Sequence, residues 1–151
     1  MTMRWLSIPM AVLLLTGCLS AKSTEEPLEA LKTRAEHARP SDQPHLFATI
    51  ARREVNEVDR FYTEGDLSSA TKAVDDLVRY AGRAAETAQK SGKHLKDTEI
   101  LLRETARRLD DVRRTLNFED RPQVEAAVKQ VEKFRQQLLD HMFGLSKGSK
   151  Q

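Results

Sequence analysis

Apolar and small side chains beyond Pro44 recur in alternating steps of three and four positions, the spacing that places them along one face of an α-helix. Between residues 67 and 90 these are Leu67, Ala70, Val74, Leu77, Ala81, Ala84 and Ala88. This is heptad spacing, as in coiled coils. The segments 95–116 and 124–142 repeat it with extra apolar residues on either side, and such broad faces are typical of a bundle core.

Residues that break helices divide this pattern into four pieces of similar length. Gly65 is followed by Asp66, a helix-capping residue, and a turn-forming segment over 117–123 contains Pro122. The break at 91–93 is less determined, because the heptad count continues through Gly92 and a single helix over 67–116 also fits. We favour two helices, since matched lengths allow a bundle to close. The predicted helices are 44–63, 67–90, 94–116 and 121–143.

The predicted fold class is therefore all-α, an antiparallel up-down bundle of about four long helices. The chain has 151 residues, enough for one domain, and only 5% aromatic residues, which argues against an all-β fold. A short helix is predicted over 27–39, separated from the bundle by two prolines, Pro40 and Pro44. We expect the bundle domain to cover 44–145 and to end in a disordered tail over 146–151.

The first residues have the pattern of an export signal. Arg4 is followed by an apolar stretch from Trp5 to Leu15, which is too short to span a bilayer. The stretch ends in Leu15-Thr16-Gly17-Cys18, which contains the single cysteine of the chain. These four residues resemble the lipobox of bacterial lipoproteins, in which a small residue precedes the cysteine that takes a diacylglycerol.

This resemblance implies cleavage between Gly17 and Cys18, which removes the signal peptide 1–17, and acylation of Cys18, including palmitate. Residues 18–43 would then comprise the lipidated cysteine, a flexible tether and the short helix. The implied partners are the membrane, through the anchor, and another envelope protein, but no nucleic acid. Leu19 follows the cysteine instead of the Asp that signals inner-membrane retention, so the resemblance implies the outer membrane, facing the periplasm, in a Gram-negative host.

We identify no catalytic or cofactor motif in the sequence, and we expect neither an enzyme nor a cofactor. No two of the four histidines stand three or four apart, so no metal-ligand pair is visible: His37, His45, His94 and His141. The sequence favours a structural or interaction module. The alternative is a sensor that binds a small ligand or metal between helices, with His141 on the apolar face and Tyr62 or Tyr80 as polar groups.

Charged side chains are expected to form solvated helix faces. Four predicted pairs have i,i+4 spacing: Glu99 with Arg103, Glu104 with Arg108, Asp110 with Arg114, and Glu125 with Lys129. The densest basic stretch, from Lys93 to Arg114, is interleaved with acids, although it could also meet anionic lipid or an acidic partner. Phe118 is predicted to plug the end of the bundle.

Residues 62–70 resemble the turn of a tetratricopeptide repeat, with Gly65 and Ala70 at the positions that allow two helices to reverse and approach. No second copy follows at a spacing of about 34 residues. An ordinary helical hairpin also requires these residue types, so we interpret the segment as a hairpin turn.

Overall fold

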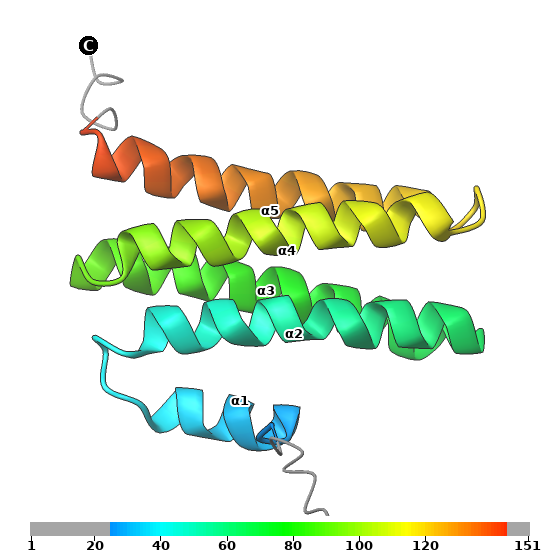
Figure 1. Ribbon diagram of the computed structural model, residues 1–151, viewed down its shortest axis with the longest axis horizontal. Coiled ribbons are helices and arrows are strands. Elements are labelled where there is room, and N and C mark those ends of the chain that lie inside the picture. The colour runs from blue at the N-terminus through cyan, green and yellow to red at the C-terminus, as the bar shows by residue number, and fades with distance from the viewer. Residues whose placement is uncertain (1–24, 145–151) are drawn as a thin grey trace, which may run out of the picture.

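A computed structural model describes residues 25–144, which form five helices and no strand (Figure 1). The helices are α1 (Leu28–His37), α2 (Gln43–Glu64), α3 (Leu67–Ser91), α4 (Leu95–Thr115) and α5 (Arg121–Met142). They confirm the all-α fold class, the four long helices and the short helix before them. The predicted signal segment, Cys18 and the tail 146–151 lie outside the described residues.

Gly92 separates α3 from α4, so the single helix over 67–116 is excluded. Its φ of 65° is left-handed, and its N–H donates to the carbonyl of Ala88 at 2.9 Å, which closes the last turn of α3. His94, two residues later, also has a left-handed φ, of 55°. Two left-handed residues this close together cannot belong to a continuous α-helix.

The four long helices alternate in direction along the chain (Figure 1). The α2–α3 hairpin packs beside the α4–α5 hairpin, so that α2 neighbours α4 and α3 neighbours α5. Each of these neighbouring pairs runs parallel. The link between α3 and α4 consequently crosses the bundle, and these two helices have less contact than any other pair of helices that pack together.

The core consists of the faces predicted from the spacing. Small residues of α3 allow α2 to approach closely, and the α2–α3 pair has the most extensive contact in the fold. A Cβ atom added at Gly82 would lie 3.0 Å from the ring of Phe134, so the glycine makes room for this aromatic side chain of α5. The buried alanines of α3 are Ala70, Ala73, Ala81, Ala84, Ala85 and Ala88.

Three expectations about side-chain burial are wrong. Leu67, the first residue of the apolar face predicted for 67–90, is 52% exposed. Phe118 is 82% exposed instead of plugging the bundle end, because the core ends with Leu116, which is 9% exposed. Arg121 Nε donates to the carbonyl of Leu116 at 2.9 Å, and the chain turns away from the core before Phe118. His141, expected on the apolar face, is also exposed, because Leu138 is the last buried residue of α5.

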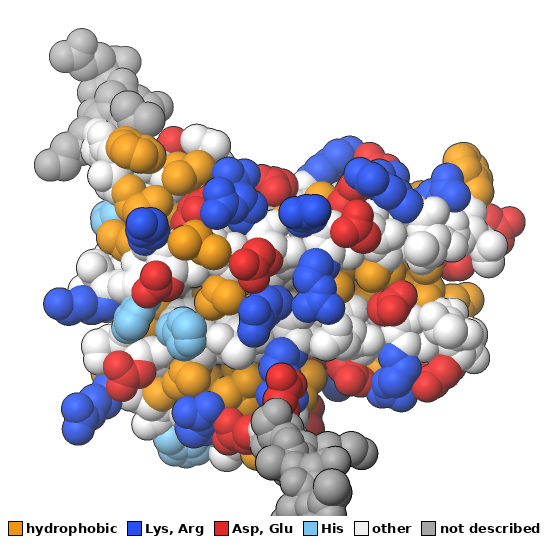
Figure 2. Space-filling model, viewed as in Figure 1, with side chains coloured by type: hydrophobic (Ala, Val, Ile, Leu, Met, Phe, Trp, Pro, Cys, Tyr) orange, Lys and Arg blue, Asp and Glu red, His pale blue; other side chains and the backbone are white. Residues whose placement is uncertain are grey.

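Two of the four predicted i,i+4 pairs are present. Asp110 pairs with Arg114 and Glu125 with Lys129, both at 2.7 Å. The other two acids contact arginines of neighbouring helices instead: Glu99 contacts Arg135 of α5 at 2.7 Å and Glu104 contacts Arg52 of α2 at 3.5 Å. Figure 2 shows acidic and basic side chains interspersed over one face of the bundle.

Within residues 25–144, no helix is both long enough and apolar enough to cross a membrane.

Candidate functional site: a charged cavity beneath the first helix

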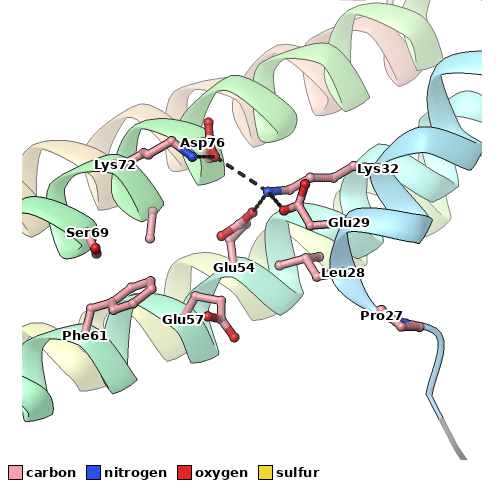
Figure 3. Close-up of a pocket in the computed structure, with 11 residues that line it drawn as sticks. Pro27, Leu28, Glu29, Lys32, Glu54, Glu57, Phe61, Ser69, Lys72 and Asp76 are labelled. Atoms are coloured by element: carbon pink, nitrogen blue, oxygen red, sulfur yellow. Dashed lines mark hydrogen bonds and ion pairs between the residues drawn. The ribbon is translucent and has the colours of Figure 1, made fainter.

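The most distinctive polar site is an open cavity of about 340 Å³ between α1, α2 and α3 (Figure 3). Its walls combine four carboxylates and two ammonium groups with an apolar surface. The acids are Glu29, Glu54, Glu57 and Asp76, the bases are Lys32 and Lys72, and the apolar surface includes Leu28, Phe61 and Ala73. The lining therefore carries more negative than positive charge.

Lys32 of α1 is at the centre of this cluster. Its Nζ atom lies 2.7 Å from Glu54 Oε1, 2.9 Å from Glu29 Oε1 and 3.6 Å from Asp76 Oδ2. One ammonium group is thus shared by carboxylates from three helices (Figure 3). The cluster connects the short helix to both members of the α2–α3 hairpin.

Glu54 is the buried member of the cluster, and only 2% of the residue is exposed. It is placed there by the helical repeat of α2, since it lies between the buried Ala51 and Val58. Glu54 Oε1 makes the ion pair with Lys32, but no well-aligned hydrogen-bond donor in the described part of the chain reaches it. A buried carboxylate in this position depends strongly on its cation.

Burial raises the pKa of the Glu54 carboxyl, and the nearby Lys32 ammonium opposes this shift. Burial alone would lower the pKa of Lys32, but its close contacts with the Glu54 and Glu29 carboxylates together outweigh that effect and raise the pKa above its ordinary value. Lys32 therefore stays protonated at neutral pH and has no lone pair for nucleophilic or base chemistry. The arrangement fits binding and docking.

A second contact fixes the other end of α1. Glu36 accepts two hydrogen bonds from the Arg83 guanidinium of α3, one of them at 2.7 Å, and this contact lowers the pKa of the Glu36 carboxyl. The guanidinium carbon of Arg83 also lies 4.1 Å from the centre of the Phe47 ring of α2. Together with the buried Leu31 and Ala35, these contacts make α1 part of the packed unit.

The structure does not bring the three sequence-predicted ligand residues together. The Tyr62 hydroxyl donates to Gln123 Oε1 at 3.3 Å, near the start of α5. His141 is 18 positions further along that helix, about 27 Å away at the rise of an α-helix. His141 lines a hollow between α3 and α5, together with Gly82, away from Tyr62.

Tyr80 is buried within the core, and its ring centre lies 6.0 Å from that of Phe47. Burial raises the pKa of both Tyr62 and Tyr80. Tyr80 and Gly82 are two positions apart on α3, so they point to nearly opposite sides of the helix. The predicted set of His141, Tyr62 and Tyr80 therefore does not form one site.

One pair of histidines does meet, although sequence spacing gave no sign of it. The rings of His45 from α2 and His94 at the start of α4 have centres 5.9 Å apart. His94 Nδ1 also lies 3.3 Å from Asp97 Oδ2. Even so, no group of three His, Cys, Asp or Glu side chains in the part of the chain that the structure describes could hold a metal ion.

Side-chain spacing along the chain does not reveal the Lys32–Glu54–Asp76 cluster. The available signal was Glu54 itself, an acid on the apolar face of a predicted helix. Its partners could not be chosen, because they belong to two other helices.

In comparisons with known proteins, no family model, no curated protein and no solved structure matches the chain.

Proposed function

We propose that this protein is a lipid-anchored component of the bacterial cell envelope, and that its helical bundle is a non-catalytic interaction module. The proposal for the anchor is supported by the lipobox-like segment ending in Cys18. A bilayer anchor at this position takes more than one acyl chain to hold stably, as lipidation of an N-terminal cysteine provides.

The observation that carries the proposal for the module is the docking of α1. Leu28, the first residue of α1, follows Cys18 by ten positions, which extend to at most about 35 Å. Because α1 is bound to α2 and α3 through Lys32 and Glu36, an anchor at Cys18 would hold the whole bundle close to the bilayer. The module would thus be presented as one rigid body.

The exposed aromatic side chains support a role in protein contacts. Phe118, in the turn between α4 and α5, is 82% exposed, and Phe143, just after α5, is 71% exposed. Aromatic residues are enriched in protein interfaces. Leu67 is also exposed, and it begins α3 at the same end of the bundle as the turn that carries Phe118 (Figure 1).

Two substitutions, one for the anchor and one for the interaction module, are tested in the same membrane preparation. Wild-type, Cys18→Ala and Phe118→Ser chains are expressed in a bacterial host, with Ser20→Ala and Glu119→Ser as controls. Mass spectrometry of the mature N-terminus is expected to show an acylated Cys18, and Cys18→Ala alone should leave the membrane fraction. An unmodified Cys18 would refute the anchor.

The same detergent extracts test the module. A partner that recurs with the wild type and with Glu119→Ser, but is lost with Phe118→Ser, would support it. Lipidation without any partner sensitive to Phe118 would refute the module at this surface and favour the second candidate function.

That second candidate is a sensor for a small ligand, and the cavity beneath α1 is the observation that favours it. The excess of carboxylates and the Phe61 ring suit a small organic cation. A panel of small amines should then give a saturable increase in melting temperature. This increase in melting temperature should be lost in Glu57→Gln. It should be kept in Glu86→Gln, because Glu86 lies outside the cavity. An equal response of both variants would refute the sensor.

A further inference from the structure

A second polar hollow of about 420 Å³ lies on another side of α1, between α1, α2 and α4, and its walls are rich in arginine. Arg34 comes from α1, Arg52 and Arg53 from α2, and Arg108 from α4. We call this hollow the arginine groove. Figure 2 shows basic side chains gathered near the middle of the visible face, where α2 and α4 lie side by side.

The chain places one of its own oxyanions in this groove. Arg34 Nη2 donates to the Glu26 carboxylate at 2.7 Å, and Arg53 Nη1 donates to the Glu26 backbone carbonyl at 2.7 Å. Glu25 approaches Arg53 only to 4.0 Å. Two of the four guanidinium groups thus already bind oxygen atoms of the segment that precedes α1.

The other two guanidinium groups keep most of their donors. Arg108 Nη2 donates to the neutral amide oxygen of Asn56 at 2.6 Å, and within residues 25–144 it makes no ion pair. Arg52 has its nearest carboxylate, that of Glu104, at 3.5 Å, the outer limit of a hydrogen bond. Since each guanidinium carries five N–H donors, both can bind a further oxyanion.

We infer that the arginine groove is a binding site for a phosphate group, in which Arg52 and Arg108 bind the oxygens and Glu26 competes for Arg34. Arginine binds phosphate through two parallel hydrogen bonds, and donors arriving from three helices suit a tetrahedral anion better than a planar carboxylate. The phosphate can be free in solution or part of a phospholipid headgroup. This inference does not depend on the lipid anchor.

The test uses the full chain at low ionic strength. Inorganic phosphate is titrated by calorimetry, and co-sedimentation is measured with vesicles of phosphatidylcholine alone or mixed with phosphatidylglycerol. The double variant Arg52→Gln/Arg108→Gln is compared with Arg103→Gln/Arg107→Gln, which removes the same charge from exposed positions of α4 outside the groove. Circular dichroism verifies that both variants are folded.

Glu26→Gln provides a test in the opposite direction, since it removes the competing carboxylate. Its control is Glu86→Gln, which changes the net charge equally at an exposed pair with Lys90, outside the groove. We expect Glu26→Gln to bind phosphate several-fold more tightly than the wild type, and Glu86→Gln to bind as the wild type does.

We expect the groove variant to lose about 10-fold in affinity and its control to lose less than about twofold. If only the titration with inorganic phosphate responds to the groove variant, the site takes free phosphate; if only sedimentation with phosphatidylglycerol responds, it takes the headgroup. Equal losses in the two double variants would show a general charge effect and overturn the inference. So would a Glu26→Gln chain that binds no more tightly than Glu86→Gln.

Discussion

Replacement of Lys32 with methionine leaves the buried Glu54 carboxylate without its cation, while the aliphatic part of the side chain stays in place. The cost at pH 7 has an upper limit, because Glu54 can take up a proton instead of staying charged. The ordinary pKa of the carboxyl is 4.5, which is 2.5 units below pH 7. At about 1.36 kcal/mol per unit, protonation costs about 3.4 kcal/mol. We therefore expect a loss of about 2–3 kcal/mol in the free energy of unfolding at pH 7.

The pH dependence distinguishes this mechanism from a loss of packing. Without Lys32, the pKa of Glu54 in the folded protein is raised further above its value in the unfolded chain. The stability of the variant therefore rises, relative to wild type, as the pH falls from 7 toward 4.5. At pH 5 the same limit is only about 0.7 kcal/mol. Most of the loss should disappear at that pH.

Urea unfolding followed by circular dichroism at pH 7 and pH 5 measures both values. Hydrogen exchange shows whether the amides of α1 open first, as expected if Lys32 holds this helix. The double variant Lys32→Met/Glu54→Gln should recover most of the stability at pH 7. Lys72→Met is the control, since Lys72 is exposed and lies 3.7 Å from Asp76, and it should have almost no effect. An equal loss at both pH values, or no recovery with Glu54→Gln, would refute the electrostatic account.

Three further predictions concern the core and the turns, and each is measured by chemical unfolding. Leu116→Ala should cost about 2–3 kcal/mol, whereas the neighbouring Phe118→Ser should stay within about 0.5 kcal/mol; a large loss from Phe118→Ser would contradict its exposure. Gly92→Ala should lower the free energy of unfolding by about 1 kcal/mol, because the left-handed φ at this position strains any residue other than glycine. A Cβ there would meet no atom within 4 Å, so the loss would come from the backbone alone, and an unchanged stability would contradict this reasoning. Thr98→Val should change the free energy of unfolding little, or raise it by up to about 1 kcal/mol, because the buried Thr98 hydroxyl has no hydrogen-bond partner among residues 25–144. A clear loss of stability would show that the hydroxyl is bound.

The helices were predictable because the signals that define them are local. The spacing of Val74, Leu77 and Ala81 identifies the buried face of α3 without any knowledge of its neighbours. The boundary at Gly92 was the least certain, since a glycine within a helix costs only about 1 kcal/mol and the apolar pattern continues past it. The left-handed conformations of Gly92 and His94 show that two helices, and not one, cover this part of the chain.

The partners of charged side chains were predictable only within a helix. Asp110 and Arg114 meet because four residues make about one turn. Glu99 and Glu104 have arginines at the same spacing, but their contacts are with Arg135 and Arg52 of other helices. An intrahelical pair contributes only a few tenths of a kcal/mol, so an acid can pair with an arginine of a neighbouring helix instead at little cost.

The sequence alone determined the fold class, the positions of the helices and most of the residues that face the core, because helical periodicity is contained in a single segment of chain. Only the tertiary structure decided which helices are neighbours and therefore which polar groups meet. Lys32, Glu54 and Asp76 lie in three different helices, with 22 positions between each one and the next, and no local pattern connects them. The same holds for the arginine groove, whose four guanidinium groups come together only when α1 and α4 pack against α2. The cavity beneath α1 and the arginine groove both follow from the packing of helices, and side-chain spacing along the chain does not encode that packing.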